Sequence, residues 1–129
     1  MNEAPDPIDI IIESFRDTKI IFIGVSHHLV SFNLKTDENL QRLYDAGVRY
    51  FLDEGGKLDD NPVITEEEML NLSDQENYFK LFYPWDYAGA RYSPEPHFYE
   101  RIALFNMDKK DEDKIKVIGM ESGRQNFVP

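Results

Sequence analysis

The chain contains no cysteine among its 129 residues. That absence excludes disulfide bonds, thiolate zinc sites, iron–sulfur clusters and thiol nucleophiles. Any bound metal must therefore be held by histidine and carboxylate side chains.

Positive charge is also scarce, since 14 Lys and Arg residues stand against 25 Asp and Glu residues and the formal net charge is -11. A surface of this charge repels phosphate backbones instead of attracting them. We therefore do not expect nucleic acid as a partner.

Long hydrophobic runs are missing too. Apolar runs such as residues 20–23 and 10–12 fall far short of the roughly 20 residues that a membrane helix needs. The first three residues, Met1-Asn2-Glu3, carry one acidic side chain and no basic one, whereas a signal peptide begins with basic residues. We expect no membrane insertion and a cytoplasmic location, or a secreted one if the chain is a fragment of a larger toxin.

The composition that is present, 41% hydrophobic and 30% charged residues, is typical of an ordinary soluble globular domain. The length suits one domain and is too short for a complete TIM barrel, which needs about 200 residues or more. We expect a single α/β domain over residues 1–129.

Three short apolar runs predict strands, at residues 19–24, 48–52 and 116–120. Helical patterns lie between them, and the first two runs with their intervening helix predict a right-handed parallel crossover. The fold class that follows is α/β, with a short, mostly parallel sheet of about three strands and flanking helices.

Capping residues predict where the helices begin and end. Asp6 and Pro7 begin a first helix that ends near Arg16, and residues 36–47 predict a second, stopped by Gly47. Residues 65–68 and 73–76 match the S/T-x-x-E capping box, so two short helices are expected between about residues 65 and 82.

The last helix begins at residues 93–94 and places Phe98, Ile102 and Phe105 on one face. Irregular structure is expected at residues 57–63, in the aromatic segment 78–92 and in the charged run 108–113.

Histidine and carboxylates follow the three predicted strands. His27 and His28 come after the first, Asp53 and Glu54 end the second, and Glu121 follows the third. Parallel strands bring such residues to the same end of the sheet, where α/β proteins bind ligands. The set predicts a general base oriented by an acid, or a His/carboxylate metal site. Capping of a turn, or a solvated side chain, is the alternative for each residue.

The motif Gly24-x-x-His27 after an apolar strand, with Glu54 ending a Gly-Val-x-x-apolar-x-Glu pattern, resembles the erythromycin-esterase/haem-uptake-lipoprotein (EreA/ChaN-like) superfamily. That group includes the TraB and Tiki proteins and a domain of dermonecrotic toxins. Residues 115–121 are similar to its next motif, with Glu121 in the place of the acid. The esterases carry a glutamate where this chain has Val25, and the TraB and Tiki pattern is satisfied by Gly24, His27 and Glu54.

The resemblance implies a hydrolase, an esterase or a metal-dependent peptidase, with His27 and Glu54 catalytic. His27, Glu54 and Glu121 would be ligands of a divalent metal ion such as Mn, Co or Zn. The substrate would be a small molecule or a peptide. The chain would be a minimal member that dimerises to complete its sheet, or the N-terminal half of a larger EreA/ChaN-like domain.

The alternative is a non-catalytic binding or interaction domain, a degenerate family member or a fragment of a larger toxin or effector. A sheet of three strands leaves both edges open, and an open edge is a template for pairing. We therefore expect a homodimer or a partner domain at these edges.

Overall fold

The computed structural model describes residues 3–24, 38–53, 61–72 and 95–119 of the chain. The chain divides into two compact units, Met1–Val48 and Arg49–Pro129. The prediction of one domain over the whole chain stays a prediction.

The first unit contains two helices that contact each other, α1 (Pro7–Ser14) and α3 (Leu40–Asp45). The Asp6 side chain accepts a hydrogen bond of 2.9 Å from the Ile8 N–H at the start of α1, which confirms the predicted cap. The fully buried Ile8 is the core residue of this helix. An ion pair between Asp9 and Arg42 links the two helices at the surface.

Helix α3 ends as the sequence predicts. Gly47 adopts a positive φ of 105°, and the N–H groups of Gly47 and Val48 donate to the carbonyls of Tyr44 and Leu43. This is the Schellman arrangement, in which a glycine takes the left-handed conformation after the last helical turn. The helix itself is shorter than predicted, and its N-cap residue Asn39 makes no side-chain capping bond.

Residues 19–24 form no strand, so the predicted first strand is wrong for the described part of the chain. A strand requires a neighbour to receive its backbone hydrogen bonds. None of the strands that the structure describes pairs with this run.

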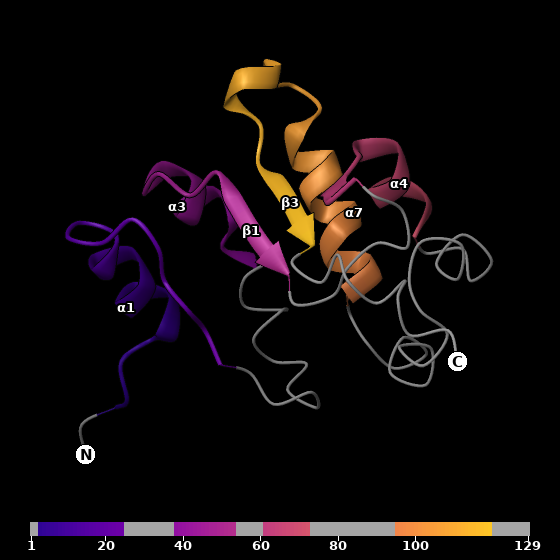
Figure 1. Cartoon of the computed structure of the whole chain (residues 1–129). Coiled ribbons are helices and arrows are strands. Elements are labelled where there is room, and N and C mark those ends of the chain that lie inside the picture. The colour runs from indigo at the N-terminus through magenta and orange to yellow at the C-terminus, as the bar shows by residue number, and fades with distance from the viewer. Residues whose placement is uncertain (1–2, 25–37, 54–60, 73–94, 120–129) are drawn as a thin grey trace, which may run out of the picture. The chain divides into compact units, whose positions relative to one another are not determined.

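The second unit holds a three-stranded sheet in the order β1-β3-β2, where β1 is Tyr50–Asp53, β2 is Val63–Ile64 and β3 is Lys116–Gly119. Strand β1 runs parallel to β3, as the arrows in Figure 1 show, and β2 runs antiparallel to it. The α/β fold class is confirmed, whereas the expectation of a mostly parallel sheet is wrong because the described sheet is mixed.

The antiparallel strand β2 lies where a loop was expected. It contains only two residues, which is too short to show an alternating pattern in the sequence. Pro62 directly precedes it, and proline is tolerated at the start of an edge strand.

Helices α4 (Glu66–Asn71) and α7 (Glu95–Asn106) pack against each other in this unit. The predicted capping box of α4 is confirmed, because Thr65 and Glu68 exchange hydrogen bonds between side chain and backbone. The second predicted capping box, residues 73–76, and the aromatic segment 78–92 lie outside the described residues.

The buried face of α7 is rotated from the predicted one. Ile102 is buried as expected, but Phe98 and Phe105 are only partly buried. The buried positions follow the spacing i, i+3, i+4 and i+7, at Tyr99, Ile102, Ala103 and Asn106. The aromatic rings therefore flank the apolar stripe.

The sheet has one face toward α7. Phe51 of β1 meets Phe98 edge to face, with ring centroids 5.3 Å apart. Val117, the register partner of Phe51, is fully buried. Successive side chains of a strand point to opposite faces, so Tyr50, Leu52 and Ile118 lie on the other face of the sheet. The core of this unit is formed by Ile64, Met69, Leu72, Tyr99, Ile102, Ala103, Ile115 and Val117.

Candidate functional site

The three residues predicted to carry the chemistry, His27, Glu54 and Glu121, lie outside the residues that the structure describes. Their assignment as catalytic or metal-binding residues therefore stays a prediction. What the structure does describe is the strands that two of them follow in the sequence.

Strands β1 and β3 end together. Asp53, the last residue of β1, is the register partner of Gly119, the last residue of β3. Because the two strands are parallel, their carboxyl ends lie at the same end of the sheet. Glu54 follows Asp53 directly in the sequence, and Glu121 follows Gly119 by two residues.

A backbone hydrogen bond on the other side of β3 also holds this end of the sheet. The Gly119 N–H donates a hydrogen bond of 2.8 Å to the carbonyl of Pro62, just before β2. The end of β3 is thus held between two neighbours, and it is a fixed position from which a functional segment could extend.

The strand predicted at residues 19–24, which would have preceded His27, is absent from the described sheet. His27 comes three residues after this run. The structure therefore brings together the strand ends before Glu54 and Glu121, whereas the segment before His27 belongs to the other unit.

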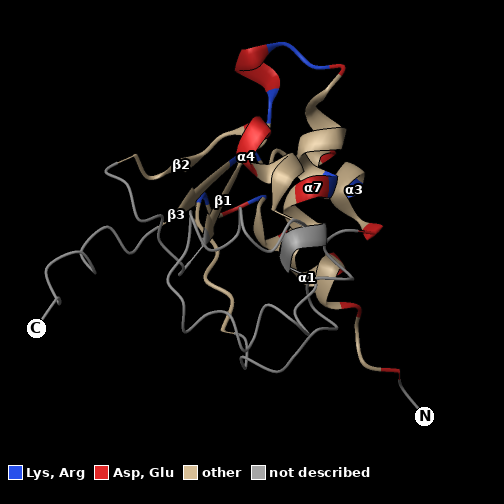
Figure 2. Ribbon diagram, turned by 90° about the vertical axis from the view of Figure 1, so that its right-hand side faces the viewer, with Lys and Arg blue, Asp and Glu red and all other residues tan. Residues whose placement is uncertain are grey.

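A polar cluster that the sequence analysis missed lies at the opposite, amino end of β3. Lys114 forms ion pairs of 2.9 Å with Glu66 on α4 and with Asp111 on the 3-10 helix η2 (Asp111–Asp113). Figure 2 shows the acidic residues, in red, on α4 and on the helical turn between α7 and β3. The sequence carried no signal for this contact, because Glu66 and Lys114 are far apart in the chain.

The charges of this cluster stabilise one another. The hydrogen bond from Lys114 lowers the pKa of Asp111, and the hydrogen bonds to Asp111 and Glu66 raise the pKa of Lys114. Asp111 and Lys114 therefore stay charged at neutral pH. The cluster thus acts as a structural link between α4 and the start of β3, without a group poised for proton transfer.

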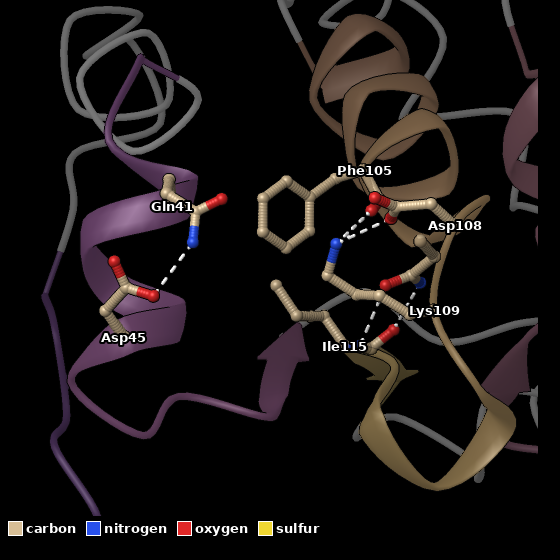
Figure 3. Close-up of polar contacts among 7 residues, drawn as sticks. Gln41, Asp45, Phe105, Asp108, Lys109 and Ile115 are labelled. Carbon is tan, nitrogen blue, oxygen red and sulfur yellow. Dashed lines mark hydrogen bonds and ion pairs between the residues drawn. The ribbon is translucent and has the colours of Figure 1, made fainter.

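Lys109 at the end of α7 has a similar role. Its Nζ atom donates to the Phe105 carbonyl at 2.7 Å and to Asp108 at 2.9 Å, and it lies 3.8 Å from the centre of the Phe105 ring (Figure 3). The hydrogen bond from Lys109 lowers the pKa of Asp108. A cation near the last carbonyls of a helix is favourable, so Lys109 closes α7.

Asn106 is the one buried polar side chain among the described residues. Its Nδ2 donates to the Ile115 carbonyl at 2.8 Å, and its Oδ1 accepts from the Ile115 N–H at 2.9 Å. The carboxamide satisfies both backbone groups of the residue that precedes β3. This pair is called the Asn106–Ile115 clamp below.

Within the described ranges, no three His, Asp or Glu side chains gather to hold a metal ion. The same part of the chain contains no helix with the length and apolar character of a membrane span. Neither finding covers His27, Glu54 or Glu121.

Comparisons of the chain with known protein families, with curated proteins and with solved structures returned no match.

Proposed function

We propose that the chain is a hydrolase of the EreA/ChaN-like type, with a His/Glu site at the carboxyl ends of the parallel strands. The observation that supports this proposal is the shared end of β1 and β3, where Asp53 and Gly119 are register partners. In parallel sheets, ligands bind beyond the carboxyl ends of the strands. Two acids, Glu54 and Glu121, follow these strand ends closely in the sequence.

In the proposed reaction, His27 takes a proton from a water molecule whose oxygen attacks the carbonyl carbon of an ester or amide. The bond from that carbon to the leaving oxygen or nitrogen breaks, and the imidazolium of His27 returns the proton to the leaving group. Glu54 orients the imidazole and stabilises its charged form.

In a metal-assisted form of the reaction, His27, Glu54 and Glu121 would instead hold a divalent ion such as Mn, Co or Zn, because one imidazole and two carboxylates are ligands that these metals accept. His27 would then be a ligand and not the general base. When bound, the ion would lower the pKa of water and polarise the carbonyl. Glu121 completes the ligand set, since a catalytic metal normally keeps about three protein ligands.

The test measures metal content by elemental analysis, metal affinity by calorimetric titration, and turnover of a chromogenic ester and a fluorogenic peptide. We expect His27→Ala to lower turnover by about 10²–10⁴-fold, the usual contribution of a general base. Glu54→Ala and Glu121→Gln should weaken metal binding and turnover together.

Matched controls come from neighbouring residues of the same kind. His28→Ala removes the adjacent histidine, and Glu67→Ala removes an exposed glutamate on α4. Neither should change metal affinity or turnover. A wild-type protein that binds no metal and cleaves neither substrate would contradict the proposal.

That result would favour the alternative function, a non-catalytic interaction domain. The observation on its side is the outer face of β1, where the side chains of Tyr50 and Leu52 are both exposed. Contiguous exposed apolar residues mark interaction surfaces.

A further inference from the structure

We draw no further inference here: the strongest candidate, the outer face of the sheet where Leu52 of β1, Ile118 of β3 and Val63 of β2 lie next to one another in register, is an apolar face of the second unit, and nothing in the structure shows what covers it.

Discussion

Residues 19–24 and 115–119 are similar apolar runs that both end in glycine, Lys-Ile-Ile-Phe-Ile-Gly and Ile-Lys-Val-Ile-Gly. The second contains the central strand of the sheet, with Ile115 and Val117 almost completely buried, whereas the first is exposed and unpaired in the described structure. Their sequences do not explain this difference. Strand β3 has β1 and β2 on its two sides and the Asn106–Ile115 clamp at its start. Strand formation thus depends on the neighbours of a run as much as on its composition.

The largest effect should come from the same substitution in both runs. Ile115→Ala removes a side chain that is 1% exposed, and we expect it to lower the free energy of unfolding by about 2–5 kcal/mol. Ile20→Ala should change it by less than about 0.5 kcal/mol, because Ile20 is mostly exposed. Urea unfolding monitored by circular dichroism provides the measurement.

Equal losses of stability in the two variants would break the comparison, because residues 19–24 would then be packed as tightly as β3.

The second prediction concerns the clamp, which the exposed run lacks. Asn106→Leu keeps the size of the side chain but leaves the N–H and carbonyl of Ile115 without their partners. The cost of such unpaired buried groups is about 1–3 kcal/mol. Asn71→Leu is the matched control, since Asn71 is exposed and bonds only within its own helix.

Thermal unfolding of both variants at one pH measures the difference. If Asn106→Leu and Asn71→Leu have equal melting temperatures, the start of β3 does not depend on the clamp. Pairing with β1 and β2 would then be what keeps β3 in place.

The smallest effect is expected from the ion pairs that precede β3. Because the pKa of Asp111 is lowered in the folded chain, its contribution to stability is present above the ordinary carboxyl pKa of about 4 and is lost as the pH falls through the lowered value. Lys114 has a raised pKa, so its contribution is present below its ordinary pKa and is lost as the pH rises through the raised value.

Asp111→Asn should therefore make the melting temperature fall less steeply between pH 5 and pH 2 (roughly the range over which carboxylates protonate) than it does in the wild type. The change is small because these groups are exposed and solvent screens them. Asp113→Asn, in the same helical turn, should follow the wild-type curve. A steeper fall in Asp111→Asn would contradict the stabilising role of the Lys114 pairs.

Local signals predicted much of this fold. The Asp6 cap, the Gly47 stop and the capping box at residues 65–68 each depend on side chains a few residues from the backbone groups that they satisfy. Such interactions are contained in a short window of sequence, and all three are present in the structure.

Long-range pairing was predicted less well. The strands expected at residues 48–52 and 116–120 are confirmed as β1 and β3, with bounds shifted by at most two residues. That these two pair directly was not predicted. The two-residue strand β2 and the unpaired state of residues 19–24 were not expected. Both depend on which segments meet in space, and apolar composition alone does not determine that.

The candidate site was predicted only as far as its strand ends. The structure confirms that β1 and β3 terminate at the same end of the sheet, shortly before Glu54 and Glu121 in the sequence. The convergence of His27 with these acids required a parallel strand at residues 19–24, which the described sheet does not contain. Side-chain chemistry can be identified from residue types, but its assembly depends on the same long-range pairing.

The Asn106–Ile115 clamp also determines how the connection between α7 and β3 can be altered. A carboxamide has the hydrogen-bonding groups of a peptide unit, so these two residues close the base of a loop formed by residues 107–114. Lengthening a loop whose ends are held costs little, because the entropy of closure grows only with the logarithm of its length. The exposed turn at Asp111–Asp113 is therefore the place where an epitope tag or a fluorescent reporter could be inserted with the sheet intact.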